Sequence, residues 1–206
     1  MKPEELIDCI NKNCKKSINP AFHLSIQNRN HNFVHYTIDG TSYAINRDES
    51  VKVINWFDEI WLFLEIKFIK DDEKNNIQII ISLSVFQGND FDNKKIQLFR
   101  AEWDDYNNPE EKRAQPHWHI NSSQAIERIF EEHTNILNES KFFQEFRDEK
   151  KKILDVKKIH FAMNGNWQNN NGNYIYKIED KQQVVRWLQG MLNYLRAELE
   201  DLLDDL

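Results

Sequence analysis

Residues 60–86 read IWLFLEIKFIKDDEKNNIQIIISLSVF, and this stretch decides the fold class. Apolar side chains alternate with Glu65 and Lys67 in its first half, and with Ser82 and Ser84 in its second half. A period of two is typical of strands that bury one face of a sheet and leave the other face more polar. The polar run between the two halves predicts a turn. The stretch therefore predicts two long antiparallel strands.

The neighbouring segments predict further strands of the same sheet. Residues 33–46 have the pattern of a hairpin whose turn is Asp39-Gly40, because an Asp-Gly pair supplies the two positive-φ positions of a type I′ turn. A third strand is expected at 96–104, and a fourth at 117–120 after a polar loop.

Outside the sheet the apolar period becomes helical, beginning with a short segment that Pro3 opens at the N-terminus. The chain is therefore expected to be a single α+β domain, with an antiparallel meander sheet followed by helices packed on one face and a long C-terminal amphipathic helix. Its expected parts are an N-terminal helix at 1–17, the sheet at 33–121, helices at 122–155, a strand pair with a loop at 157–178, and the C-terminal helix at 180–206.

The composition limits the class of protein. The chain has 206 residues, of which 40% are hydrophobic, and this content excludes a wholly disordered chain. No apolar run approaches the roughly 20 residues of a membrane span, so no membrane partner is expected. The N-terminus lacks the apolar region of a signal peptide. Cys9 and Cys14 lack the CxxC spacing of zinc or redox sites, so two reduced thiols in a cytoplasmic protein are expected.

The net charge is unevenly distributed. The formal total is −7, which disfavours an overall basic binder of nucleic acid. From residue 196 to residue 206, one arginine stands against five acidic residues, a net charge of −4. The rest of the chain is only mildly acidic. Nucleic acid is therefore not indicated by the charge but stays open as a partner.

The most distinctive chemistry lies in LFRAEWDDY at 98–106, followed after a loop by QPHWHI at 115–120. If Asp104 pairs with His117, then Glu102 pairs with His119, and all four side chains share a polar face with Arg100. Three interpretations stay open. The cluster could hold a divalent metal (Zn, Mn or Fe) through His117, His119 and Glu102. It could perform acid–base chemistry in which Arg100 stabilises a phosphate-like charge, or it could be a polar sheet face whose charges pair across strands.

No complete catalytic motif surrounds these residues, because the chain has neither a Gly-rich phosphate loop nor a nucleophile elbow. The order of a strand with Arg, aromatic and acidic residues, a loop and then Pro-His-x-His-Ile, over residues 96–120 only, resembles the TumE-type toxins of bacterial toxin–antitoxin modules. The resemblance implies a setting of bacterial conflict and suggests His117 and His119 as functional positions.

The C-terminal segment carries an apolar seam in steps of three and four residues over about three heptads. The simpler interpretation is a helix that packs on its own sheet. The sharper one is a helix that binds a protein partner or a second copy of the chain, through Leu188, Leu192, Leu195, Leu199, Leu202 and Leu206. Acidic residues oppose the helix dipole at the C-terminal end, and a basic partner would relieve this, so a protein contact is predicted there.

Two functions follow from these features. The first is a non-catalytic subunit or adaptor of a bacterial cytosolic multi-protein assembly, with a defence or toxin–antitoxin system as its expected setting. The apolar seam supports it, and Trp61 and Phe63 would add support if they were exposed. The alternative is a metal-dependent or His-based hydrolase, nuclease-like, that uses the hairpin carrying His117 and His119.

Overall fold

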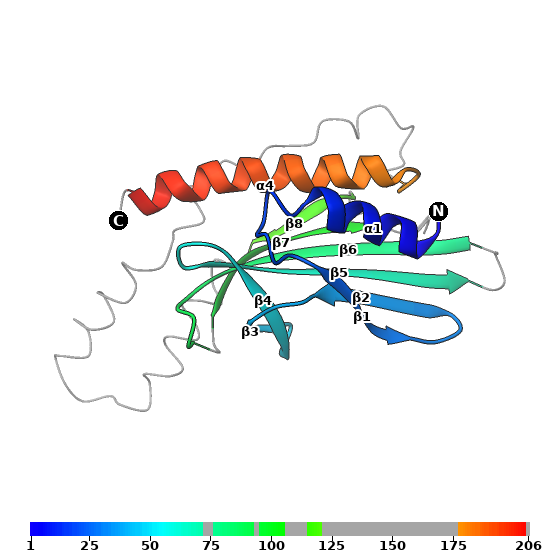
Figure 1. The fold of residues 1–206 in the computed structure, drawn as a ribbon, viewed down its shortest axis with the longest axis horizontal. Helices are drawn as coiled ribbons and strands as arrows, with labels where there is room; N and C mark the ends of the chain where they lie inside the picture. The colour runs from blue at the N-terminus through cyan, green and yellow to red at the C-terminus, as the bar shows by residue number, and fades with distance from the viewer. Residues whose placement is uncertain (72–75, 93–94, 106–114, 121–176, 205–206) are drawn as a thin grey trace.

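A computed structural model describes residues 1–71, 76–92, 95–105, 115–120 and 177–204 (Figure 1). Within them, eight antiparallel strands form a sheet, and two helices cover one of its faces, which confirms the predicted α+β class. The predicted helices at 122–155 and almost all of the strand pair at 157–178 lie outside the described residues. The elements are α1 (Pro3–Asn13), β1 (Leu24–Arg29), β2 (Phe33–Ile38), β3 (Ser42–Asn46), β4 (Glu49–Phe57), β5 (Ile60–Asp71), β6 (Asn76–Gln87), β7 (Ile96–Asp104), β8 (His117–Ile120) and α4 (Lys181–Asp204).

Strands β5 and β6 are the centre of the sheet, as their alternation predicts. They pair over their whole length, and the strand order is β1-β2-β5-β6-β7-β8. Ile66 of β5, Ile81 of β6 and Trp103 of β7 lie side by side, and the Trp103 ring meets Trp187 of α4 with ring centres 5.2 Å apart. This face is therefore the core face beneath the helices. Glu65, Ser82 and Glu102 form the adjacent row, which belongs to the opposite, polar face.

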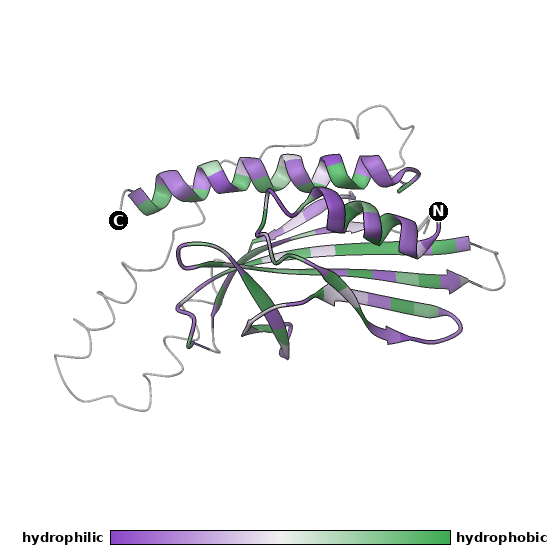
Figure 2. Cartoon of the chain, viewed as in Figure 1, coloured by the Kyte–Doolittle hydropathy of each residue, from purple (hydrophilic) through white to green (hydrophobic). Residues whose placement is uncertain are grey.

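Both helices are amphipathic, with hydrophobic and hydrophilic bands that alternate along them (Figure 2). The α4 seam packs on the chain's own sheet, because four of its leucines are completely buried: Leu188, Leu192, Leu195 and Leu199. This burial contradicts the interpretation of these four residues as a partner surface. Leu202 is partly buried against the core, and Leu206 lies outside the described residues. Neither described helix combines the length and apolar character that a membrane crossing requires.

Trp61 and Phe63 are also buried, which removes the second support for a docking surface. Their exposed fractions are 4% and 3%. The Trp61 indole N–H donates to the Gly88 carbonyl over 2.7 Å, and the ammonium of the buried Lys95 lies 4.4 Å from the centre of its ring. The two thiols behave as predicted: Cys9 and Cys14 are free, and burial raises the pKa of Cys14 to about 12.

The prediction of a hairpin at 33–46 is wrong. Strand β2 pairs with β1 and β5, whereas β3 pairs with β4, and neither β1 nor β4 is predicted by the sequence. The positive-φ turn lies instead between β3 and β4, at Arg47 and Asp48 with φ of 50° and 67°. Gly40 has a different role, because a Cβ atom there would lie 2.4 Å from the Val53 carbonyl oxygen. The chain needs this glycine for close approach of two backbones.

Substituting Gly40 tests this packing role. Gly40→Ala is expected to lower the free energy of unfolding by about 3 kcal/mol, because the backbone of Val53 cannot move aside easily. Gly190 of α4 is the matched control, since nothing lies within 4 Å of a Cβ there. Gly190→Ala is expected to raise stability by about 1 kcal/mol through helix propensity. Urea unfolding of both variants measures the difference, and equal effects would contradict the packing role of Gly40.

The β3–β4 hairpin lies against the polar side of the sheet, and buried polar contacts hold it there. Asn46 Oδ1 accepts hydrogen bonds from Gln97 Nε2 (3.2 Å) and Ser84 Oγ (3.4 Å), which join the hairpin to β7 and β6. The Lys95 ammonium donates to Ser42 Oγ (2.8 Å) at the start of β3 and to the Asp92 carbonyl (2.6 Å). These contacts bring the turn after β3 to the polar residues of β7.

Candidate functional site

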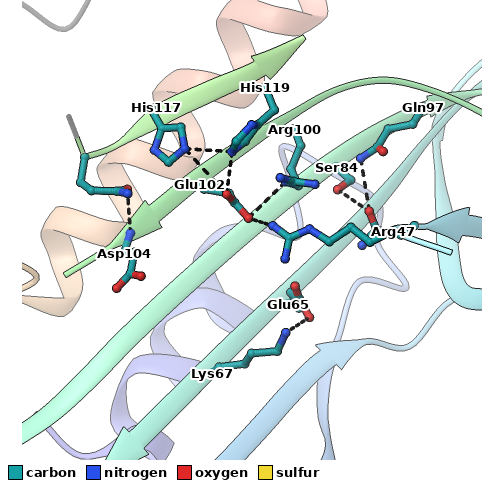
Figure 3. Close-up of polar contacts among 12 residues, drawn as sticks. Arg47, Glu65, Lys67, Ser84, Gln97, Arg100, Glu102, Asp104, His117 and His119 are labelled. Atoms are coloured by element: carbon teal, nitrogen blue, oxygen red, sulfur yellow. Dashed lines mark hydrogen bonds and ion pairs between the residues drawn. The ribbon is translucent and has the colours of Figure 1, made fainter. Parts of the chain in front are cut away.

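Glu102 of β7 and the two histidines of β8 form a compact cluster on the polar face (Figure 3). His119 Nε2 lies 2.7 Å from Glu102 Oε2 and 2.8 Å from His117 Nε2. His117 Nε2 lies 3.8 Å from the same carboxylate oxygen. Both imidazoles thus present Nε2, and the carboxylate presents one oxygen, to a common point. All three side chains are partly buried.

The separations suit a set of metal ligands. Ligand atoms at the roughly 2.1 Å bond lengths of zinc lie about 3.4 Å apart in tetrahedral geometry. The three observed separations lie on either side of that value. Hydrogen bonds alone cannot satisfy all three close contacts of the cluster, because a protonated imidazole nitrogen cannot also accept a hydrogen bond. If His119 Nε2–H donates to Glu102, it has no lone pair to offer His117. A cation at the common point would satisfy all three lone pairs together.

The strand register differs by two residues from the prediction. Glu102 pairs with His117, and Arg100 pairs with His119, whereas Asp104 was expected opposite His117. Gln115 Oε1 accepts a hydrogen bond from the Asp104 backbone N–H over 2.9 Å and so sets where β8 begins. A shift of two preserves the face, so the metal-ligand set of the prediction still converges. Asp104 lies outside it, with its carboxylate 2.8 Å from Gln78 Nε2.

Two arginines contact the carboxylate oxygen that faces away from the histidines. Arg100 Nε lies 3.1 Å from Glu102 Oε1, and Arg47, at the turn after β3, forms an ion pair with the same oxygen. Figure 3 shows both guanidinium groups turned toward Glu102, Arg100 from β7 and Arg47 from the turn after β3. Burial and the charge of Arg47 lower the pKa of Arg100 to about 10, so Arg100 stays charged at neutral pH. The arginines orient Glu102 and place positive charge beside the histidines.

A second charged group lies two strands away on the same face. Glu65 Oε2 is 2.9 Å from Lys67 Nζ and 3.1 Å from His35 Nε2, and Glu65 is only 7% exposed. Burial by itself would raise the pKa of Glu65, but the hydrogen bonds and charges of His35 and Lys67 outweigh it and lower the pKa. Ser82 lies in register between Glu65 and Glu102, and its buried Oγ has no hydrogen-bond partner among the described residues.

A pocket of about 600 Å³ lies between the β3–β4 hairpin and strands β1, β2 and β5. Arg47 lines this pocket and also contacts Glu102, so the pocket adjoins the cluster of Glu102, His117 and His119. Glu65, His35 and Lys67 form part of its wall, and two aromatic residues, Tyr43 and Phe63, form another part. The polar face therefore combines a cluster of potential metal ligands with an adjacent cavity of small-molecule size.

Sequence reasoning placed Glu102, His117, His119 and Arg100 on one face, as the structure does, but missed the rest of this surface. Arg47 lies 55 positions from Glu102 and has no ligand spacing that would signal it. Glu65 and Lys67 could have been recognised as candidate site residues, because they are charged residues within an otherwise apolar strand. Their position on the same face as Glu102 depends on the pairing of β5, β6 and β7.

Comparisons with known proteins do not indicate the family or the function of this site. No protein-family model matches the chain, and neither the curated proteins nor the solved structures contain a match. The resemblance of residues 96–120 to TumE-type toxins therefore stays a prediction. Function has to be inferred from the geometry and charge of the site.

Proposed function

We propose that Glu102, His117 and His119 bind a divalent transition metal, with zinc as the best fit, and that the protein is a metal-dependent hydrolase of phosphate esters. The observation that carries this proposal is the convergence of two Nε2 atoms and one carboxylate oxygen within 3.8 Å of one another. Two imidazoles and one carboxylate leave coordination positions open for water and substrate, as in catalytic rather than structural zinc sites.

The charges around the ligands support an anionic substrate. Arg47, Arg100 and Lys67 carry positive charge, against the carboxylates of Glu65 and Glu102. These five side chains together have a net charge of +1, which a divalent ion would raise to +3. A phosphate monoester dianion is complementary to that charge, and guanidinium groups are the preferred partners of phosphate oxygens.

The chemistry follows from these parts. A divalent ion held by Glu102, His117 and His119 would lower the pKa of a coordinated water from about 15.7 toward about 7. Attack of that water oxygen on phosphorus would break the P–O bond to the leaving group, and the departing alkoxide would take up the proton that the water loses. The products are inorganic phosphate and an alcohol. Arg100 and Arg47 stabilise the negative charge on the phosphate oxygens during this step.

The alternative proposal of a non-catalytic adaptor stays untested. Two of its supports from the sequence are weakened, because four of the seam leucines and the aromatics Trp61 and Phe63 lie in the chain's own core. The lack of a complete catalytic motif still supports it. No observation on the described part of the chain favours it over the hydrolase. A protein contact at the acidic end of α4 stays a prediction that concerns Leu202 and Leu206 only.

Metal titration of the full chain tests the proposal. After removal of bound metal with a chelator, the protein is expected to take up one Zn²⁺ per chain in competition with a chromogenic indicator. Hydrolysis of p-nitrophenyl phosphate is expected to require Zn²⁺ or Mn²⁺ and to stop on addition of excess chelator. Absence of stoichiometric binding would overturn the metal site. Binding without hydrolysis of this or other phosphate esters would overturn the assignment as a phosphate-ester hydrolase.

A further inference from the structure

The pocket beneath the β3–β4 hairpin is not used by the ligand cluster, although the two share a residue. Arg47 contacts Glu102 through one terminal nitrogen and also lines the cavity. A phosphate held between the cluster and Arg47 therefore has the remainder of its molecule directed toward this cavity. The side chains that line the cavity then indicate the chemical class of that remainder.

The lining combines two aromatic side chains and several neutral polar groups with five charged residues, which are Arg47, Glu49, Lys52, Glu65 and Lys67. Tyr43 of β3 is 47% exposed, so its ring is accessible, and Phe63 of β5 adds a second aromatic side chain to the wall. Gln27 and Thr37 contribute an amide and a hydroxyl, which can both donate and accept hydrogen bonds. Aromatic surface together with such groups suits a flat heterocycle with polar edges, because bases gain about 1–3 kcal/mol each by stacking on aromatic side chains.

The size and charge of the cavity further restrict the ligand. A volume of about 600 Å³ is within the range of small-molecule sites and accommodates one nucleotide. Glu65, with an exposed fraction of 7%, places a carboxylate in the wall beside Lys67. Apart from Arg47, the charged lining residues are Lys52 and Lys67 against Glu49 and Glu65, with no net charge. This balance favours the neutral base of a nucleotide over a second phosphate, so a polynucleotide backbone fits this cavity less well than a mononucleotide.

We infer that the substrate is a nucleoside monophosphate, with its base in the pocket against Tyr43 and its phosphate at Arg47 beside the metal ligands. This inference rests on the proposed hydrolase function for the place of the phosphate. It adds a recognition site for a base, formed by the β3–β4 hairpin and the polar face of β5. The hairpin thereby determines which phosphate ester reaches the metal ligands.

Calorimetric titration of the full chain with adenosine 5′-monophosphate and with ribose 5-phosphate tests the inference. The nucleotide is expected to bind at one site per chain and at least about tenfold more tightly than ribose 5-phosphate, since the base adds a stacking contact. Tyr43→Ala is expected to remove that preference while leaving the affinity for ribose 5-phosphate unchanged. Phe91→Ala is the matched control, because Phe91 is 96% exposed and outside the pocket.

Equal affinity for the two ligands, or a nucleotide preference that survives Tyr43→Ala, would overturn the inference. The result is separable from the proposed hydrolase. The titration is repeated in excess chelator and with His117→Ala/His119→Ala. A Tyr43-dependent preference for the nucleotide in these conditions supports the base site even if the metal site fails. Zinc-dependent hydrolysis without any preference for the nucleotide would support the hydrolase and reject the base site.

Discussion

Replacing His117 and His119 together by alanine is expected to abolish stoichiometric zinc binding and to lower metal-dependent phosphate ester hydrolysis by at least about a thousandfold. The variant retains only Glu102 of the three convergent ligands. A single carboxylate does not hold zinc against a competing chelator, and without the ion water keeps its high pKa. Chelator competition and initial rates on the same preparation measure both effects.

The fold should tolerate this change, because both histidines are only partly buried on β8, a strand at the end of the described sheet order. Far-ultraviolet circular dichroism checks that expectation. His23→Ala/His31→Ala removes the same number of imidazoles from exposed positions and is expected to keep full zinc binding. Asp104→Asn is also expected to keep it, because Asp104 lies outside the cluster and its carboxylate contacts Gln78 Nε2. Unchanged zinc stoichiometry in the His117→Ala/His119→Ala variant would refute the site.

Replacing Leu192 by aspartate is expected to unfold the protein at 37 °C. Leu192 is completely buried in the seam of α4. Loss of the side chain costs about 2–5 kcal/mol, and burial of an unpaired carboxylate adds several more. The sum is comparable to the whole stability of a domain, roughly 5–15 kcal/mol. Thermal unfolding followed by circular dichroism is the measurement.

Asn193→Asp is the matched control, because it introduces the same charge one position along the helix on an exposed side chain. Its effect on the midpoint of thermal unfolding is expected to be small. The pair separates the two interpretations of the seam. If Leu192→Asp left the fold and its stability intact, α4 would be a detachable helix available to a partner rather than part of the core.

Much of the central sheet follows from local pattern. The alternation in β5 and β6 fixes which side chains face the core, and the structure places the strands at the positions that the pattern predicts. The same period brought Glu102, His117 and His119 to one face even though the expected register was two residues off. A pattern of period two specifies faces, but it does not distinguish registers that differ by an even number of residues.

The Asp39-Gly40 turn shows where local pattern misleads. Asp-Gly favours a type I′ turn, yet Gly40 serves a close approach to the backbone of Val53. The actual turn uses Arg47 and Asp48, whose positive φ values depend on the surrounding hairpin. Strands β1 and β4 could not be assigned from alternation, because neither has a regular period-two burial pattern: β1 is mostly exposed, and β4 changes from exposed to buried along its length.

By itself, the sequence determined the α+β class, the central strands, the amphipathic end helix and the shared strand face of Glu102, His117 and His119. Only the tertiary structure decided that the leucine seam is core, that Arg47 reaches Glu102, and that a pocket adjoins the ligands. The physical reason is the range of the forces involved. Side-chain alternation and helical period are set between near neighbours in the chain. The place of the β3–β4 hairpin is set by hydrogen bonds between residues about 50 positions apart, such as Asn46 with Gln97 and Ser42 with Lys95.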